Sequence, residues 1–359
     1  MISKLRKPIA AVFSAASFLA LAPSAALAQD AQAAEFKSIF DSALGTEARA
    51  PQTFEAVYST DLERRVADLA DGSRGRIGVY AIDLSTGQEV GVLADQRFPM
   101  ASTSKVAIAA TFLAGVDQGK WSLTSEFPLL IPVASGKFSS SRAPVREGNY
   151  VPAQRLIDLM IAKSCNTCTD ALLRVVGGPE AVNKWMRGAG IEGFQLTRDI
   201  ATLVRDDGEF DPATQIDLRD SATPRAMGQL LAGVHQGKWL SPRSRSVLLN
   251  AMGQTTTGRN RMKAALPSYA DLAHKTGTLS RTASDIGIFR LPDGRQVAAA
   301  IFVTGQSANL VDEARNKAGA KAKRDQRIAS ITRALYDGFA AQPTMAQRQV
   351  WTSAPYGGN

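Results

Sequence analysis

Residues 98–105 read Phe-Pro-Met-Ala-Ser-Thr-Ser-Lys and carry a serine and a lysine three positions apart, Ser102 and Lys105. The pattern from Ser102 to about Leu231 is mostly helical, so the pair is expected at the start of a helix. Positions i and i+3 share one helix face, which places the hydroxyl beside the amine. An amine there lowers the cost of forming an alkoxide or, when neutral, takes the proton, and the helix N-terminus adds favourable electrostatics. The segment predicts a serine nucleophile assisted by a lysine.

Two further triplets follow in chain order. Ser164-Cys165-Asn166 has the form S-x-N, and Lys275-Thr276-Gly277 has the form K-T-G. Each motif alone is weak, because a serine and a lysine three apart on a helix are common and a K-T-G is often only a turn. All three in this order, each at the edge of a predicted element, point together to one nucleophilic site.

The composition excludes several classes of protein. The chain has 359 residues, 45% hydrophobic and 21% charged, which is typical of a globular protein and excludes collagen, coiled coil and long disorder. Its two cysteines and two histidines lack the spacing of zinc ligands, so no metal or cofactor is expected. The net charge of +9 is scattered and forms no basic stripe, so no nucleic-acid partner is expected.

The first 28 residues have the pattern of a secretory signal peptide. A basic start with Lys4, Arg6 and Lys7 precedes a mostly apolar, uncharged stretch over 8–25, and Ala26-Leu27-Ala28 is a small-x-small cleavage site. Serine and proline residues interrupt the apolar stretch, which favours a cleaved leader over a retained anchor. No other stretch reaches the ~20 apolar residues that a spanning helix needs. We therefore expect cleavage after Ala28, no stable membrane span, and a periplasmic or secreted protein.

Predicted strands at both chain ends enclose the helical middle. The elements in order are a tether over 29–53, a helix over 54–70, a hairpin over 76–93, strands over 271–278, 284–291 and 296–304, a closing helix with Ile328, Ile331, Leu335 and Phe339 on one face, and a tail over 343–359. This order predicts one α/β domain over 54–342, into which a helical subdomain over about 102–250 is inserted.

The three motifs and their flanks resemble the class A serine β-lactamases, within the penicillin-recognising serine enzymes. The matching flanks are Phe98–Ala101, Gly177–Pro179, Arg219–Pro224, Thr257–Pro267, Asp285–Gly287 and Val297–Val303. The resemblance covers about 76–339. It implies a three-layer α/β/α domain, whose antiparallel sheet is built from both chain ends, plus an inserted all-helical domain, with the site in the cleft between them. It also implies a monomer without cofactor that acts on a small-molecule β-lactam or a peptidoglycan-derived substrate.

The resemblance also implies a role for each matching residue. Ser102 would be the acylated nucleophile, and Lys105 would assist removal of its proton. Ser164 would pass a proton to the leaving β-lactam nitrogen. Asn166 would hydrogen-bond the acylamide side chain of the substrate.

The remaining implied substrate contacts lie near the K-T-G motif. Lys275 and Thr276 would bind the substrate carboxylate, and Arg261 matches a position from which some members reach it. Gly277 and Thr278 continue the binding strand. The backbone N–H groups of Ser102 and Thr278 would form an oxyanion hole, in which each donor contributes on the order of 3 kcal/mol.

The family's deacylation base, a glutamate in the Ω loop, has no counterpart at the expected position. Counting from Arg198, that position falls near Ile200, which cannot transfer protons. Arg198–Arg219 is also a few residues longer than usual. Glu209 is the only glutamate nearby. Two interpretations stay open: Glu209 is shifted into the catalytic role, or it belongs to a solvated acidic turn.

Two more departures lie beside the S-x-N motif. Asp170 stands where the family has an asparagine that helps hold the glutamate, and a carboxylate facing a carboxylate would be repulsive. Cys165 replaces the family's aspartate, and Cys168 follows at i+3, about 5–6 Å away on a helix and within reach of a disulfide. The pair is either a local bridge that rigidifies the turn or two small buried thiols.

These observations predict a serine β-lactamase-like hydrolase that acts through an acyl-enzyme on Ser102. The missing glutamate supports an alternative, a penicillin-binding, D-Ala-D-Ala peptidase-like or sensing protein that acylates but deacylates slowly. A third hypothesis is a non-catalytic scaffold that has kept the fold.

Overall fold

The structure is a computed structural model that describes residues 58–71 and 74–342. The predicted signal peptide over 1–28, the tether over 29–53 and the tail over 343–359 lie outside the described residues. In the described ranges no helix is both long and apolar enough to cross a membrane.

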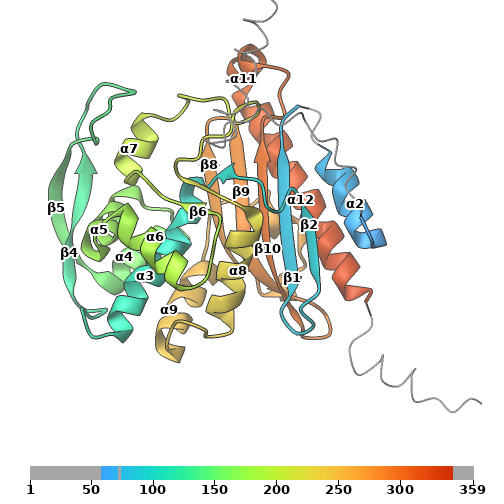
Figure 1. Ribbon diagram of the computed structural model, residues 1–359, viewed down its shortest axis with the longest axis horizontal. Coiled ribbons are helices and arrows are strands. Elements are labelled where there is room, and N and C mark those ends of the chain that lie inside the picture. Colours follow the sequence, from blue (N-terminus) through green and yellow to red (C-terminus); the bar gives the residue numbers. More distant parts are fainter. Residues whose placement is uncertain (1–57, 72–73, 343–359) are drawn as a thin grey trace, which may run out of the picture. The chain divides into compact units, whose positions relative to one another are not determined.

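A five-stranded antiparallel sheet joins the two ends of the described chain (Figure 1). Its spatial order is β2-β1-β10-β9-β8. The strands are β1 Ile77–Asp83, β2 Glu89–Val92, β8 Ala273–Leu279, β9 Thr282–Arg290 and β10 Gln296–Thr304. β1 pairs with β10, with Ile77 opposite Val303, so N-terminal and C-terminal segments are adjacent in one sheet. The predicted sheet from both chain ends is confirmed.

Helices cover both faces of this sheet, which explains its continuous apolar strands. In β10, Val297, Ala299, Ile301 and Val303 enter one core, whereas Ala298, Ala300 and Phe302 enter the other. Alternate side chains point to opposite faces, so one strand supplies both cores.

Two helices close the outer face of the sheet. They are α2 Asp61–Ala70 and α12 Lys317–Ala340. Thr60 and Glu63 form a capping box at the start of α2. The predicted face of the closing helix is confirmed, because Ile328, Ile331, Leu335 and Phe339 are all fully buried.

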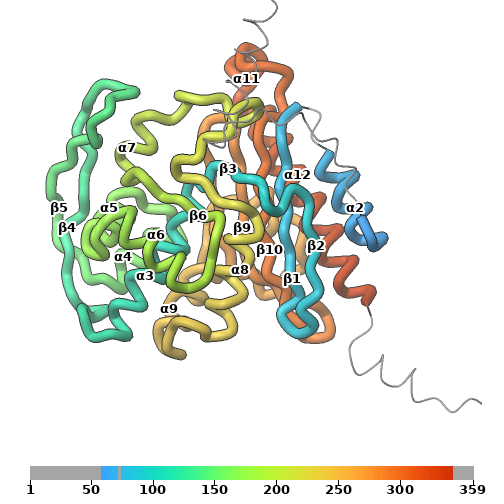
Figure 2. The backbone as a smooth tube through the Cα atoms, viewed as in Figure 1, coloured from blue at the N-terminus to red at the C-terminus, as the bar shows by residue number. Residues whose placement is uncertain are grey.

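The inserted helices share the core on the other face (Figure 2). They are α3 Lys105–Asp117, α4 Ala153–Ala162, α5 Asn166–Val176, α6 Pro179–Gly188, α8 Pro224–His235 and α9 Pro242–Gly253. α8 packs against β10 and β1, and α9 packs against β8. Shorter helical segments are η1 Ala101–Ser104, α7 Ile200–Arg205, α10 Met262–Ala265, η2 Ser268–Ala270 and α11 Leu310–Arg315.

The insert is not all-helical, which corrects the prediction. β4 Glu126–Pro132 and β5 Val145–Pro152 form an antiparallel hairpin. Only Leu130 of these strands is buried, so the hairpin lacks the alternating apolar pattern by which a strand is recognised. A small second sheet, in the order β3-β7-β6, consists of β3 Phe98–Pro99, β7 Ser221–Ala222 and β6 Phe194–Gln195.

Candidate active site

Ser102 lies in η1, one turn before α3, at a sharp turn of the chain. The preceding Ala101 has φ 49°, in the left-handed region that costs a residue with a side chain about 1 kcal/mol. The Met100 N–H donates to the carbonyl of Asp220 at 3.0 Å, which ties this turn to the end of the Ω loop. The nucleophile predicted from the S-x-x-K motif therefore stands on a fixed turn at the edge of the helical core.

Lys105 is fully buried and directs its amine at the S-x-N turn. Its Nζ donates to the carbonyl of Ser164 at 2.8 Å, to Ser164 Oγ at 3.2 Å and to Asn166 Oδ1 at 2.7 Å. Burial holds the pKa of Lys105 well below its usual value, and the charge of Lys275 adds to this effect, whereas Asp170 opposes it. This shift makes the neutral amine more accessible; in that form it can accept a proton and has two N–H groups for the three nearby oxygens.

Ser164 joins two lysines. Lys275 Nζ donates to Ser164 Oγ at 3.0 Å and to the carbonyl of Thr276 at 2.8 Å. Burial lowers the pKa of Lys275 to about 7; Asp285 opposes the shift and Arg261 adds to it. One hydroxyl therefore connects both amines and can carry a proton between them.

The binding strand β8 approaches the nucleophile turn closely at Gly277. A Cβ at this position would lie 2.7 Å from the Met100 carbonyl oxygen and 3.0 Å from the Ala101 Cβ. Only glycine permits this approach, which brings the chain just before Thr278 against the chain just before Ser102. Thr276 is held from the side by a 2.6 Å hydrogen bond between its hydroxyl and that of Thr257.

Arg261 lies beneath β8 and is 2% exposed. Its Nε donates to Asp325 at 2.6 Å, one Nη to the Gly277 carbonyl at 2.8 Å and the other to Thr278 Oγ1 at 2.7 Å. The guanidinium therefore fixes the end of the K-T-G strand, a contact that the motif alone did not indicate.

The Ω loop is closed at its neck by an ion pair between Arg198 Nε and Asp220 at 2.5 Å. Asp220 also accepts the N–H groups of Thr197 at 2.8 Å and Arg198 at 3.0 Å. Inside the loop, α7 begins at the buried Ile200. Ile200, the residue that the count from Arg198 places nearest to the family's glutamate, is therefore buried at the start of this helix.

Asp170 binds the backbone at this same place. Its two carboxylate oxygens accept the N–H groups of Ile200 at 2.7 Å and Ala201 at 2.9 Å. Burial raises the pKa of Asp170 to about 6, although the two backbone hydrogen bonds oppose the shift. The carboxylate of Asp170 therefore holds the start of α7, because the first N–H groups of a helix need acceptors.

Glu209 lies elsewhere in the Ω loop. Its carboxylate accepts from Arg219 at 2.7 Å and lies 4.0 Å from Arg198. Its side chain is 31% exposed. Within the described residues, none of its hydrogen bonds or ion pairs reaches Ser102 or either lysine, so the structure does not bring it together with the other predicted site residues.

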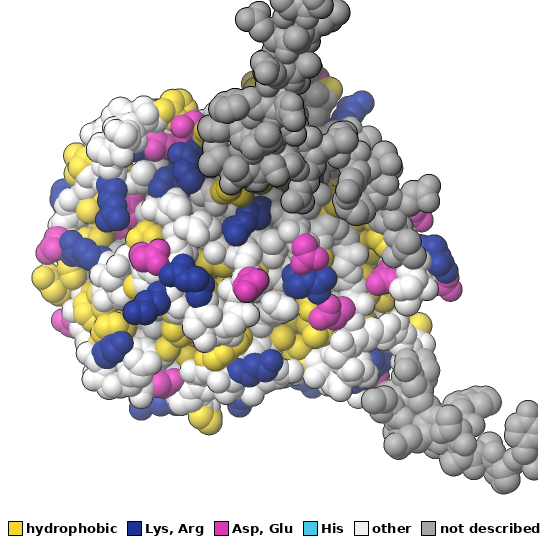
Figure 3. All heavy atoms as spheres, viewed as in Figure 1, with side chains coloured by type: hydrophobic (Ala, Val, Ile, Leu, Met, Phe, Trp, Pro, Cys, Tyr) yellow, Lys and Arg dark blue, Asp and Glu magenta, His cyan; other side chains and the backbone are white. Residues whose placement is uncertain are grey.

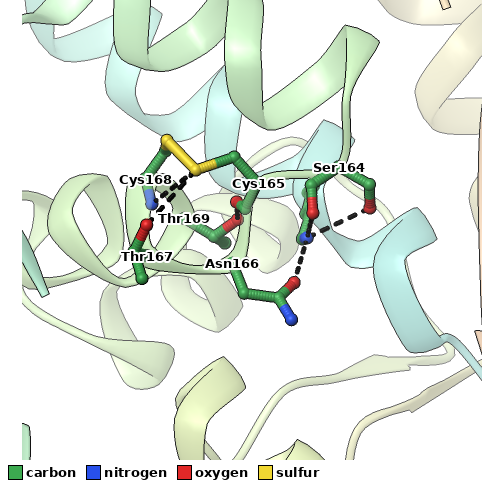
Figure 4. Close-up of a disulfide and its surroundings, with 7 residues drawn as sticks. Ser164, Cys165, Asn166, Thr167, Cys168 and Thr169 are labelled. Atoms are coloured by element: carbon green, nitrogen blue, oxygen red, sulfur yellow. Dashed lines mark hydrogen bonds between the residues drawn. A yellow bond between two sulfur atoms is a disulfide. The ribbon is translucent and has the colours of Figure 1, made fainter. Parts of the chain in front are cut away.

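The two cysteines are bonded to each other. Cys165 and Cys168 form a disulfide with a Cα–Cα distance of 5.4 Å, at the start of α5 (Figure 4). Of the two alternatives that the sequence left open, the structure has the local bridge. Among the described residues, no cluster of three or more His, Cys, Asp or Glu side chains could hold a metal ion.

Charged side chains of both signs are interspersed on the face of the molecule in Figure 3. This mixture agrees with the scattered surplus of basic residues in the sequence.

Comparison with known proteins assigns the family. The model of the β-lactamase enzyme family matches residues 61–339. The extended-spectrum β-lactamase PER-1 of Pseudomonas aeruginosa is 29% identical over 67% of this chain and 79% of its own length. The β-lactamase CTX-M-8 of Citrobacter amalonaticus is 30% identical over 74% of this chain and 88% of its own length.

Solved structures agree with this assignment. A β-lactamase from Chitinophaga pinensis superposes with a TM-score of 0.65 at 29% identity, over 78% of this chain and all of its own. A mutant of the reconstructed last common ancestor of Gram-negative class A β-lactamases superposes with a TM-score of 0.63 at 30% identity, over 79% of this chain and all of its own. The chain therefore belongs to the β-lactamase enzyme family, as a class A serine β-lactamase.

Proposed function

We propose that the protein hydrolyses the β-lactam amide through an acyl-enzyme on Ser102, after export to the periplasm. The observation that carries this proposal is the convergence of Lys105 and Lys275 on one hydroxyl, Ser164 Oγ, at 3.2 and 3.0 Å. Export is supported by the signal-peptide pattern over 1–28 and by the disulfide, since disulfides persist in oxidising compartments.

In the acylation step, Ser102 Oγ attacks the β-lactam carbonyl carbon and gives its proton to Lys105. The backbone N–H groups of Ser102 and Thr278 stabilise the negative charge that develops on the carbonyl oxygen. When the carbon–nitrogen bond breaks, Ser164 donates its proton to the leaving nitrogen and takes one from a neighbouring lysine. Lys275 and Thr276 hold the substrate carboxylate meanwhile.

In the deacylation step, water attacks the ester carbon, which releases the opened product and restores the hydroxyl of Ser102. The low pKa of Lys105 makes this amine available as the base for the attacking water. We expect deacylation to be slower than in family members that carry the glutamate.

A chromogenic cephalosporin tests hydrolysis. We expect the purified mature protein to turn over the compound well above a Ser102→Ala variant at the same high enzyme concentration. Turnover no faster than in that variant would refute the hydrolase.

A second candidate function is favoured by Ile200 at the place of the usual glutamate: the protein acylates and stays acylated, as a penicillin-binding, peptidase-like or sensing protein. Intact-mass spectrometry after removal of excess penicillin separates the two functions. An adduct that persists for hours supports this second candidate, and rapid loss of the adduct supports the hydrolase.

Glu209→Gln tests the role of the one glutamate in the loop. Because Arg219 and Arg198 already neutralise this carboxylate, we expect the deacylation rate to stay within about twofold of wild type. Accumulation of acyl-enzyme in the variant would instead identify Glu209 as the base.

A further inference from the structure

The turn that carries Ser164 and Asn166 has a backbone conformation that must be held in place. Ser164 has φ 59°, in the left-handed region. Such a conformation costs a residue with a side chain on the order of 1–3 kcal/mol and persists only where its surroundings fix it. Both residues contact Lys105, so the conformation of this turn determines the contacts of the general base.

Cys165 lies between these two residues, and its N–H, carbonyl and sulfur each have a bonding partner. Its N–H donates to the Leu159 carbonyl at 3.1 Å, and its carbonyl accepts from Thr169 Oγ1 at 2.7 Å. Its Sγ is bonded to Cys168 and also accepts the Cys168 N–H at 3.1 Å. Cys165 is therefore the N-cap residue of α5, with a sulfur in place of the usual oxygen.

Sulfur accepts hydrogen bonds weakly, so this cap needs further support. Asp, Asn, Ser and Thr are the residues that cap helices well, because a side-chain oxygen accepts the N–H of the first turn. At Cys165 the covalent bond to the residue that donates this N–H keeps the cap closed. In Figure 4 the disulfide lies on one side of the turn, and the Asn166 side chain points away from the sulfur atoms.

We propose that the Cys165–Cys168 disulfide is a positioning element for acylation, which does the work of a capping carboxylate and holds Ser164 and Asn166 against Lys105. This inference rests on the proposed acylation of Ser102. When the bridge is absent, the turn relaxes and Lys105 loses the alignment of its three acceptors. Acylation then slows.

The substrate-binding strand is held mainly by contacts away from the bridge, although Lys275 Nζ also donates to Ser164 Oγ. Lys275 and Thr276 belong to β8, which is held by β9, Thr257 and Arg261. Loss of the bridge should therefore lower the acylation rate constant by a larger factor than it raises the dissociation constant of the initial penicillin complex, to which the turn contributes only Asn166 and the Ser164 contact of Lys275. A general loss of stability would not lower the acylation rate constant selectively in this way.

Two matched variants test this inference. Cys165→Ala with Cys168→Ala removes both bridge and cap, whereas Cys165→Asp with Cys168→Ala lacks the bridge but has an oxygen cap. Rapid-quench intact-mass spectrometry over a range of penicillin concentrations gives both constants. We expect the first variant to acylate at least about tenfold more slowly, and the second to recover to within about threefold of wild type.

Leu62→Ala controls for stability. Leu62 is a buried residue of α2 that packs against α12, and it is no part of the site. Its acylation rate should equal that of wild type although its Tm is lower. The inference is overturned if the double-alanine variant acylates as fast as wild type, or if the aspartate variant acylates as slowly as the double-alanine variant. It is also overturned if Leu62→Ala slows acylation as much as the double-alanine variant does. Failure of the wild type itself to acylate, relative to Ser102→Ala, would instead refute the proposed function.

Reduction of the wild type gives an independent test. A phosphine takes the oxygen of a water molecule while the two sulfurs take its protons, which leaves two thiols and a phosphine oxide. Because Cys168 is 1% exposed, iodoacetamide is added in denaturant; we expect it to label both cysteines only after the phosphine treatment, and the folded reduced protein to acylate as slowly as the double-alanine variant. Labelling of both cysteines before reduction, or full activity after it, contradicts the inference.

Discussion

At the scale of single residues, the buried Lys275 should make acylation depend on pH. Lys275 has a pKa of about 7, so its ammonium form is present below pH 7 and is lost above it. In the proposed mechanism this ammonium binds the substrate carboxylate, so acylation efficiency should fall as pH rises through 7. Lys275→Arg keeps the charge at every pH. We expect the variant to be slower but flat from pH 7 to 9, as measured by kcat/KM or by acylation efficiency; an unchanged fall near pH 7 would exclude Lys275 as its origin.

Asp170 links pH to stability. Its pKa is raised to about 6 from an ordinary value of 3.8, so the folded state binds this proton more tightly than the unfolded state. The stabilisation is full below pH 3.8 and is lost as pH rises through 6. The unfolding free energy of Asp170→Asn minus that of wild type should therefore rise by about 2–3 kcal/mol from pH 4 to pH 7.5. Urea denaturation over this range measures the difference, and parallel curves for the two proteins would contradict it.

At the scale of elements, the contact between β8 and η1 would set the geometry of the proposed oxyanion hole. Gly277→Ala would place a methyl group 2.7 Å from the Met100 carbonyl oxygen and force the two elements apart. Loss of one oxyanion donor costs on the order of 100-fold, so we expect acylation to slow by at least about tenfold.

Gly228→Ala is the matched control for this change, because Gly228 lies in α8, away from the nucleophile. Its methyl group would lie 2.2 Å from the Tyr80 ring. It should lower Tm and leave acylation unchanged. Equal acylation rates in the two variants would show that the β8–η1 contact does not determine the rate.

Elements with strong apolar periodicity could be predicted from the sequence. The strands β1, β9 and β10 and the face of α12 lie within a few residues of their predicted ranges. The β4–β5 hairpin could not be predicted, because most of its side chains are exposed and its stability comes from strand pairing. Helix α7 could not be predicted either, because it lies in a polar segment. Asp170 and Asp199 supply acceptors for its first N–H groups.

At the scale of the described molecule, the sheet separates two cores. Ser102 and Lys105 belong to the side of α3, whereas Phe339 is fully buried in the core with α2 and α12. Phe339→Ala should lower the unfolding free energy by about 3–5 kcal/mol, because it leaves a cavity in this second core. Chemical denaturation measures the loss. Acylation well below Tm should match wild type, and a slower rate in the folded variant would show that the two cores are coupled.

The motifs named residues that the structure joins, Lys105, Ser164 and Lys275, but not how they are held. The role of Ser102, recognisable from the same kind of short pattern, stays a prediction. The supports of the site residues are single contacts between distant segments, such as Thr257 with Thr276 and Arg261 with the Gly277 carbonyl. The run Thr255-Thr256-Thr257 was the one local signal, because three adjacent hydroxyls suit a segment that binds backbone and side chains.

The central claim is that β-lactams acylate Ser102, and rapid-quench intact-mass spectrometry tests it most directly. Wild type and Ser102→Ala are mixed with excess penicillin and quenched at intervals from milliseconds to hours. We predict that wild type gains the mass of one intact penicillin, on a peptide that contains Ser102, and that the variant gains none. Wild type without an adduct at any time and without turnover above the variant, or an equal adduct on both proteins, would contradict the account.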